Sequence, residues 1–309
     1  MTTPRVIFAG TPEFALASLR ALVDAGITPV AVFTQPDRPA GRGKQLKASP
    51  VKEYALEQSI DVYQPESLRN DDVVAQIAAL DADVMIVVAY GLLLPQEVLD
   101  LPRAGCVNVH ASLLPRWRGA APVQAAILAG DEQTGVCLMS ITAGLDCGPV
   151  FSNTTLQIGG DETAGELHDR LADAGGALLV QDLRRIVDGE LEAVSQDEAR
   201  ATYAHKIKTE DARIDWQRPA DELARLVRAY NPVPGAFFML DDQRIKCWRA
   251  AADGRANAAP GEVIASDANG VVVACGEGSL RLLELQRPGK TRVDAAQFTA
   301  NTELVGKQL

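Results

Sequence analysis

Long apolar runs are missing from this sequence. No hydrophobic stretch approaches the roughly 20 residues that a helix needs to cross a bilayer. The first residues, MTTPRVIFAG, lead directly into a buried-strand pattern without a signal or transit segment. We therefore expect a cytoplasmic protein that makes no membrane contact.

Cysteine and histidine are also scarce. The five cysteines are odd in number and scattered, with no C-x-x-C spacing, which argues against a disulfide framework and a thiolate zinc site. The three histidines, His110, His168 and His205, lack the spacing of metal ligands, so we expect no metal. A serine hydrolase built on Ser112 is excluded, because no G-x-S-x-G motif surrounds that residue.

Basic residues are in the minority and unevenly distributed. The formal net charge is -11; residues 206 to 309 carry 15 basic and 14 acidic side chains, and residues 1 to 205 carry 15 and 27. The two parts therefore have net charges of about -12 and about +1 in chain order. This asymmetry permits an RNA contact on the second part or on a local basic loop. Because 309 residues exceed one comfortable core, two domains are the default expectation.

Continuous apolar runs separated by helical patterns occupy the first part of the chain. Thr11 can cap a helix that begins near Pro12 and stops at Gly26. The runs that we expect to form strands are RVIFAG (5–10), PVAVFT (29–34), DVMIVVAYG (83–91) and CVNVH (106–110). Because these runs do not alternate with polar residues, they predict a mostly parallel sheet covered by helices on both faces.

The sequence pattern indicates that the first domain ends near residue 189 and that a different kind of structure follows. Two more strands are expected at 135–142 and 149–158, then a long helix over 162–189 that a glycine pair can break. Beyond a polar stretch, one helix is followed by short alternating strands with Asn-Gly and Gly-Glu-Gly turns, which suggest a small antiparallel barrel. We assign residues 1–189 to the first domain, 190–206 to a linker and 207–309 to the second domain.

A polar pair stands at the end of the strand CVNVH. Side chains alternate along a strand, so Asn108 and His110 point to one face, at the carboxyl end where open α/β sheets bind ligands. A histidine can move a proton near pH 7 and an asparagine amide can donate to a developing oxyanion, and acyl transfer needs both. A hydrogen-bonded core histidine is the alternative.

The glycine-flanked loop AGLDCG (143–148) presents Asp146 directly after a strand. Its carboxylate can orient His110 or raise the pKa of the imidazole, and an ordinary turn aspartate is the alternative. Trp117 and Arg118 lie beside the catalytic strand in sequence, where we expect the tryptophan to pack and the arginine to contact substrate.

A basic loop, QPDRPAGRGKQLK (35–47), follows the second expected strand. It is too rich in proline and glycine to be a helix. Its cations, which can meet phosphates, are Arg38, Arg42, Lys44 and Lys47. A solvated loop without a ligand is the alternative.

These motifs together resemble a known family. The segment NVHASLLPRWRGAAP (108–122), with GLDCG about 35 residues further on, is similar to the 10-formyltetrahydrofolate-dependent formyltransferases. The motifs FAGTPEFA (8–15), FTQPDRPAGRGK (33–44), VVAYGLLLP (87–95) and ARIDW (212–216) resemble the members that act on methionyl-tRNA, so the resemblance covers essentially the whole chain. It implies a Rossmann-like catalytic domain and a smaller, OB-like C-terminal β-barrel domain.

The resemblance also implies an activity and a site. Such an enzyme transfers a formyl group from 10-formyltetrahydrofolate, its co-substrate, to the α-amino group of methionine on initiator methionyl-tRNA, which supports translation initiation. In the catalytic positions, His110 shuttles protons, Asn108 steadies the oxyanion and Asp146 orients His110. The residues at the family's folate contacts are Ser112, Leu113, Leu114, Pro115 and the backbone of Val88, Ala89, Tyr90 and Gly91.

Contacts to tRNA are expected from both domains. On the basic loop they are Arg38, Arg42, Lys44 and Lys47, with Arg42 foremost, and in the second domain Arg213 and Lys246. We expect a monomer. Two other functions stay open: a relative that formylates a small amine, such as a nucleotide-linked sugar, and a catalytically silent folate- or RNA-binding protein. The silent protein would be expected to have lost Asn108, His110 or Asp146, and all three are present.

Overall fold

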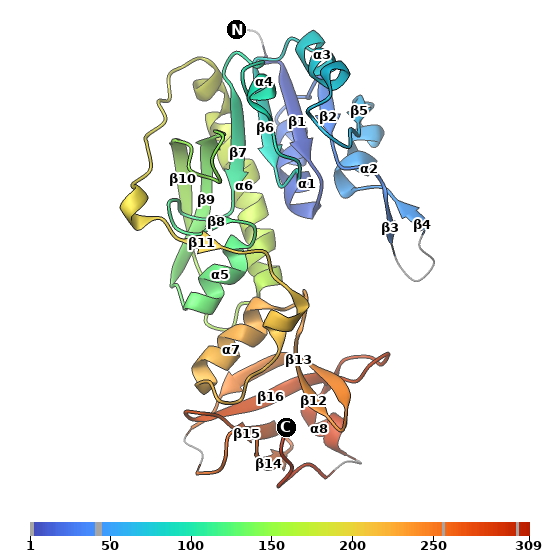
Figure 1. Ribbon diagram of the computed structural model, residues 1–309, viewed down its shortest axis with the longest axis vertical. Helices are drawn as coiled ribbons and strands as arrows, with labels where there is room; N and C mark the ends of the chain where they lie inside the picture. Colours follow the sequence, from blue (N-terminus) through green and yellow to red (C-terminus); the bar gives the residue numbers. More distant parts are fainter. Residues whose placement is uncertain (1–2, 41–44, 255–256, 301–302) are drawn as a thin grey trace. The chain divides into compact units, whose positions relative to one another are not determined.

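A computed structural model describes residues 3–40, 45–254, 257–300 and 303–309 (Figure 1). The chain divides into two compact units. Unit 1 comprises residues 1–122, 133–156 and 168–204, and unit 2 comprises residues 123–132, 157–167 and 205–309.

Unit 1 is built on a mostly parallel sheet, as the apolar runs predict. Its strands are β1 (Val6–Gly10), β2 (Ala31–Phe33), β5 (Val62–Tyr63), β6 (Val84–Val88), β7 (Cys106–His110), β9 (Gln133–Ser140) and β10 (Val150–Gln157). The strand order is β10-β9-β7-β6-β1-β2-β5 (Figure 1). The pairs from β5 to β7 are parallel, and β9 runs antiparallel to β7.

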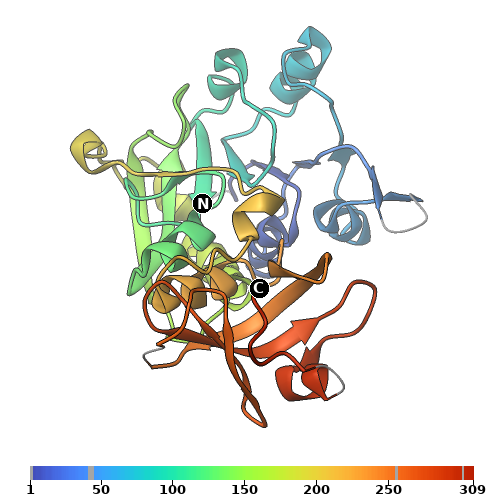
Figure 2. The ribbon, with the colours of Figure 1, turned by 60° about the horizontal axis from the view of Figure 1, so that its bottom comes forward.

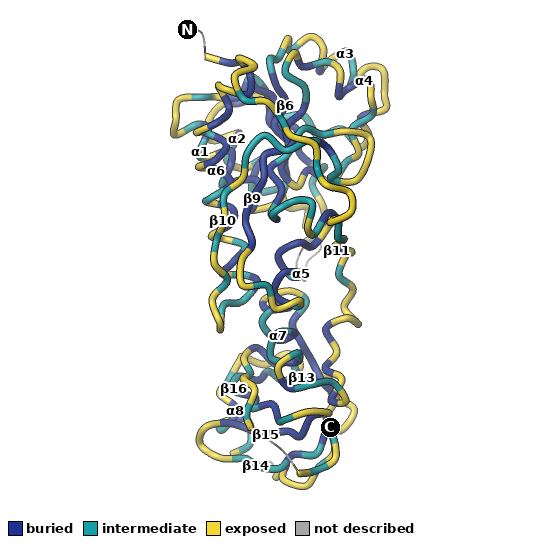
Figure 3. Tube along the Cα trace, turned by 90° about the vertical axis from the view of Figure 1, so that its left-hand side faces the viewer, coloured by how far each residue is buried: buried dark blue, intermediate teal, exposed yellow. Residues whose placement is uncertain are grey.

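Both faces of this sheet are covered at its central strands, whereas the edge strand β10 is partly exposed along its length. One face packs on helices α3 (Asp71–Ala79) and α4 (Gln96–Leu99), in a core that includes Ile7, Phe33 and Met85. The other face contacts α1 (Glu13–Asp24) and α2 (Pro50–Glu57). Figure 3 shows β6 as buried, which holds for its whole length, and β9 is buried between its first and last residues. Continuous apolar strands are stable here because neither face meets water.

The long helix α6 (Ala164–Val187) is not broken by its glycine pair. A Cβ on Gly175 would lie 2.9 Å from Val109 Cγ1, and one on Gly176 would lie 3.0 Å from Ala21 Cβ. The expectation that the glycines could interrupt the helix is therefore wrong. They let α6 approach the sheet and α1 closely, and this packing outweighs their low helix propensity.

The strand order reverses between β1 and β6. The chain runs from β1 outward through β2 to β5 and then crosses to β6 on the other side of β1. The loops that follow β1 and β6 therefore leave in opposite directions and separate at the carboxyl edge of the sheet. Such a reversal is where open α/β sheets bind ligands.

Unit 1 also contains two short strand pairs that are separate from the main sheet. Strands β3 (Arg38–Ala40) and β4 (Gln45–Lys47) pair antiparallel within the predicted basic loop. Strand β8 (Arg118–Gly119) pairs parallel with β11 (Tyr203–Ala204), which follows the 3-10 helix η1 (Glu198–Arg200). The segment that we expected as a linker thus lies within unit 1 as far as residue 204.

Unit 2 is an antiparallel β structure with helices. Its strands are β12 (Ala236–Leu240), β13 (Gln243–Ala252), β14 (Val263–Asp267), β15 (Gly270–Ala274), β16 (Ser279–Gln286) and β17 (Val293–Asp294), drawn in orange to red in Figure 2. The order is β12-β13-β16-β15-β14, and β17 pairs with β16.

The helices of unit 2 include α7 (Ala220–Ala229), which is strongly amphipathic and buries Leu223 and Leu226 in the unit's core. The others are α5 (Pro122–Ala129), whose residues from 123 onward belong to this unit, η2 (Thr209–Ala212) and α8 (Ala295–Thr299). In the part of the chain that the structure describes, no helix combines the length and apolarity needed to cross a membrane.

Candidate active site

His110 ends strand β7 in a buried position. Its side chain is 7% exposed, and Nε2 lies 3.1 Å from the carbonyl oxygen of Trp117. Because a carbonyl only accepts, Nε2 donates in this contact. Asn108 is half-buried two residues earlier and pairs in register with Val87 on one side and Met139 on the other. The structure therefore places the two predicted residues on one strand at the carboxyl edge.

The structure brings Asp146 to His110. The Asp146 carboxylate oxygen Oδ2 lies 3.8 Å from His110 Nδ1 and accepts a hydrogen bond of 2.7 Å from the backbone nitrogen of Gly119. Asp146 has a left-handed backbone (φ 47°) in the loop that joins β9 to β10. When His110 is protonated, both of its ring nitrogens therefore face an acceptor.

Two opposing effects act on the imidazole. Burial lowers the pKa of His110, while the Asp146 carboxylate and the Trp117 carbonyl raise it, and the net direction is downward from the ordinary value. We expected the carboxylate to favour the imidazolium form, and its contribution has that sign, but desolvation outweighs it. The neutral form of His110, which can accept a proton, is therefore favoured.

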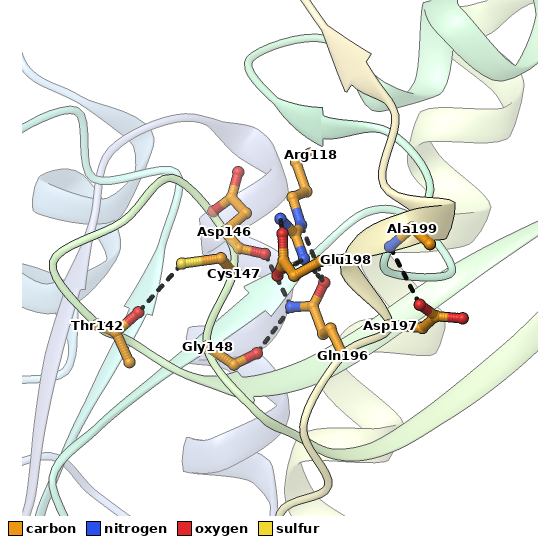
Figure 4. Close-up of polar contacts among 9 residues, drawn as sticks. All are labelled: Arg118, Thr142, Asp146, Cys147, Gly148, Gln196, Asp197, Glu198 and Ala199. Atoms are coloured by element: carbon orange, nitrogen blue, oxygen red, sulfur yellow. Dashed lines mark hydrogen bonds and ion pairs between the residues drawn. The ribbon is translucent and has the colours of Figure 1, made fainter.

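Arg118 does not point to a substrate. Its side chain is 1% exposed, and it donates to Gln196 Oε1 (3.0 and 2.9 Å) and to both carboxylate oxygens of Glu198 (2.9 and 2.7 Å). Gln196 in turn donates to the backbone carbonyls of Asp146 (2.8 Å) and Gly148 (2.7 Å), as Figure 4 shows. The expectation that Arg118 contacts substrate is therefore wrong, because its guanidinium is occupied by these partners.

A cavity of about 470 Å³ opens where the strand order reverses. Its lining comes from the segments after β1, β2 and β6 and from the β3-β4 pair, namely Thr11, Pro12, Gln35, Pro36, Arg38, Pro39, Lys47, Ala48, Ser49, Pro50, Ala89, Tyr90 and Gly91. Two buried polar atoms of this lining, the Tyr90 hydroxyl and Gln35 Nε2, have no hydrogen-bond partner among the described residues. Unpaired buried polar atoms are costly, so they mark a place where a ligand can supply the partner.

The predicted folate residues fall into two groups. Ala89, Tyr90 and Gly91 line the cavity, while the Val88 side chain is fully buried in β6, which leaves only its backbone for a ligand. Ser112 is also buried, and its hydroxyl donates to the carbonyl of Arg116 at 2.6 Å. With Leu113, Leu114 and Pro115 it forms the turn between His110 and Trp117.

The predicted tRNA residues of unit 1 lie on the basic loop. Arg38 and Lys47 face each other across the β3-β4 pair and line the cavity, and Arg38 also donates to Gln35 Oε1 at 2.8 Å. Arg42 and Lys44 lie outside the described residues.

In unit 2, Arg213 and Lys246 lie on either side of Phe237. Arg213 forms an isolated bridge with Phe237, whose partner in the β12-β13 register is Lys246. The Lys246 ammonium donates to the Pro234 carbonyl at 2.8 Å and lies over the Trp248 ring. The structure therefore places the two residues in one row across three adjacent chain segments, with Phe237 between them.

Sequence reasoning missed Gln35 and Gln196. Gln35 stands in the quoted segment FTQPDRPAGRGK, in which only the cations were considered, and Gln196 lies in a polar stretch that no local motif marks. Within the described ranges, no group of three or more histidine, cysteine or acidic side chains could hold a metal ion.

Comparison with known proteins identifies the family. Residues 4–183 match the formyl transferase family, and residues 206–302 match the C-terminal domain of formyl transferases. This chain therefore belongs to the formyltransferase family. Methionyl-tRNA formyltransferases from Pseudomonas putida (strain W619) and Burkholderia multivorans are 54% and 52% identical to it, over 92% and 99% of this chain and 92% and 97% of theirs. Within the family it groups with these methionyl-tRNA formyltransferases.

Solved structures agree on the fold. HypX from Aquifex aeolicus in complex with tetrahydrofolic acid has a TM-score of 0.64 at 17% identity, covering 100% of this chain and 49% of HypX. An N-formyltransferase from Helicobacter canadensis, in complex with folinic acid and dTDP-3-aminofucose, has a TM-score of 0.67 at 17% identity, covering 92% of this chain and 99% of its own.

Proposed function

We propose that this enzyme transfers a formyl group from 10-formyltetrahydrofolate to the α-amino group of methionine carried by initiator tRNA. The observation that carries the proposal is the pairing of His110 with Asp146 next to Asn108, in a chain 54% identical to a methionyl-tRNA formyltransferase over nearly its full length. Both a proton carrier and an oxyanion donor stand at one strand end, as direct formyl transfer requires.

The residues divide the chemistry between them. The methionine α-amine attacks the formyl carbon, and the Asn108 amide donates to the oxyanion that develops on the formyl oxygen. His110, favoured in its neutral form by burial, accepts the proton that the amine nitrogen releases. It then returns this proton to N10 of the folate as the bond between N10 and the formyl carbon breaks. The Asp146 carboxylate stabilises the imidazolium between these two steps.

The cavity at the strand reversal provides room for substrate beside this site. Its lining includes Ala89, Tyr90 and Gly91, which follow β6, and β6 is the strand that pairs with β7, which carries Asn108. The unpaired Tyr90 hydroxyl and Gln35 Nε2 suit a polar ligand such as a pterin or a nucleotide. Ser112 to Pro115 and the backbone from Val88 to Gly91 remain our candidates for folate contact.

Cations on both units are proposed to bind tRNA. Arg38 and Lys47 rim the cavity, where they can meet the phosphates of an acceptor end, and Arg42 and Lys44 belong to the same loop. In unit 2, Arg213 and Lys246 flank Phe237. Phosphate contacts of this kind hold a tRNA without reading its sequence.

The test is formyl transfer from 10-formyltetrahydrofolate by the full chain. Methionine-charged initiator tRNA is compared with uncharged tRNA, free methionine and a nucleotide-linked amino sugar, and the formylated product is quantified. We expect transfer to the charged tRNA alone. The His110→Ala variant should bind folate and fail to turn over. Transfer to the amino sugar in place of the tRNA would refute the proposed acceptor.

A further inference from the structure

We propose that Gln196, oriented by Arg118, is a positioning residue that holds the Asp146 loop so that the Asp146 carboxylate faces His110. Its amide group donates to the carbonyl oxygens of Asp146 and Gly148, at 2.8 and 2.7 Å. The two bonds grip the backbone on both sides of Cys147 (Figure 4). The inference rests on the proposed function, for which His110 and Asp146 are catalytic.

The orientation of the Gln196 amide is fixed by its partners. Arg118 only donates and the two loop carbonyls only accept, so one arrangement satisfies all of them: Oε1 toward Arg118 and Nε2 toward the loop. The guanidinium is 1% exposed and is held in turn by Glu198. Because the buried Arg118 fixes the orientation of the Gln196 amide, the hydrogen bonds from that amide restrict the backbone of the loop.

The loop needs such a hold because of its backbone. Asp146 has a φ of 47°, a left-handed conformation that aspartate adopts more readily than most residues other than glycine and that still costs free energy relative to an ordinary backbone. Gly144 and Gly148 flank it, and the neighbouring Leu145 side chain is 61% exposed, so local packing adds little. Hydrogen bonds from outside the loop therefore help to keep this conformation, and Gln196 supplies two of them. The Gly119 backbone supplies the third, to the carboxylate itself.

Two variants distinguish the role of the acceptor Oε1, which faces Arg118, from the role of the donor Nε2, which faces the loop. Gln196→Met keeps the length and removes both polar ends. Gln196→Glu keeps an acceptor for Arg118, and with it the structural contact, but loses the donors to the loop. Asp197→Ala is the matched control, because the exposed Asp197 accepts a hydrogen bond from the Ala199 backbone on the same segment and, among the described residues, makes no hydrogen bond or ion pair with the loop.

The first readout is turnover. We expect kcat to fall about tenfold to 10²-fold in both Gln196 variants, with KM for folate and tRNA within about twofold of the parent, since a displaced carboxylate affects chemistry more than binding. Asp197→Ala should leave both constants unchanged. Parent-like kcat in Gln196→Glu would overturn the proposal, because that variant keeps the Arg118 contact, loses both donors to the loop and sets a carboxylate oxygen against the two loop carbonyls.

The second readout is the titration of His110 in the protein without substrates. The chain has three histidines, so histidine-selective NMR can follow His110 against His168 and His205 as internal references. Removing the carboxylate in Asp146→Asn should lower the pKa of His110. If Gln196 acts through Asp146, Gln196→Met should lower it too, and the double variant should titrate like Asp146→Asn alone.

Two outcomes of the titration would overturn the positioning role: an unchanged or raised His110 pKa in Gln196→Met, or additive shifts in the double variant. Because this measurement needs neither folate nor tRNA, its result is independent of whether the proposed acceptor is correct. Failure of the proposed function would instead appear as absent formyl transfer in the unsubstituted protein.

Discussion

Replacing Gly119 by alanine should destabilise unit 1 and disturb the site together. Gly119 has a φ of 113°, and a Cβ there would lie 2.6 Å from the backbone oxygen of Ala204 in the paired strand β11. Its backbone nitrogen is the donor to the Asp146 carboxylate. The methyl group must therefore push β8 and β11 apart and move the donor that holds Asp146.

The expected magnitude has two parts. A residue other than glycine at this φ costs about 1–3 kcal/mol of backbone strain. Overpacking against a backbone atom, which cannot rotate away as a side chain does, costs about 1–3 kcal/mol more. The matched control is Gly189→Ala, because Gly189 has a φ of 73° and open space around its Cβ position, so only the backbone cost of about 1–2 kcal/mol remains.

Calorimetry of the two variants checks the reasoning. For a unit of this size, each 1 kcal/mol shifts Tm by about 2–4 °C. From the middle of these ranges, about 4 against about 1.5 kcal/mol, we expect Gly119→Ala to lower Tm of the transition assigned to unit 1 roughly two to three times as much as Gly189→Ala does. The kcat for formyl transfer should fall in Gly119→Ala alone. Equal losses of stability in the two variants, or parent-like turnover in Gly119→Ala, would show that the contact with Ala204 does not matter.

Other substitutions test the remaining parts of the site. Asp146→Asn removes the contribution that raises the pKa of His110, so the acid limb of the kcat/KM profile should move to lower pH while activity falls. An acid limb at the parent pH would show that Asp146 does not influence the titration of His110. Tyr90→Phe removes a buried hydroxyl without a partner, so Tm should stay equal or rise, while KM for one substrate rises; a drop in Tm would mean that the hydroxyl is satisfied within the protein. Arg42→Ala should raise KM for tRNA more than KM for folate and weaken the salt dependence of the tRNA constant, and equal effects on both substrates would argue against a phosphate contact.

Much of the fold could be predicted because its strands are continuous apolar runs. Such runs occur where both faces of a sheet are covered, and the structure confirms this for β1 and β6. The unbroken course of α6 could not be predicted, since the close approach of Val109 and Ala21 that makes its glycines favourable is a tertiary contact. The antiparallel pairing of β9 with β7 could not be predicted either, because the direction in which β9 joins the sheet depends on the path of the chain between them and not on a local sequence pattern.

The site was accessible from the sequence in part. Asn108 and His110 share a face of one strand, so their proximity follows from alternation alone, and the Asp146 contact with His110 is confirmed at 3.8 Å. The buried state of Arg118 could not be predicted, because its partner Gln196 lies 78 residues further along the chain in a stretch without periodicity. The folate and tRNA contacts stay predictions.

The position of Gln196 in the chain has a consequence for biosynthesis. Asn108, His110 and Asp146 leave the ribosome well before residues 190–204, which complete the Arg118 cluster and pair β11 with β8. A nascent or truncated chain that stops at the end of α6 would contain every catalytic side chain and lack the amide that orders Asp146. Competence for formyl transfer should therefore arise late in synthesis, and a fragment intended to carry the chemistry has to extend through Ala204.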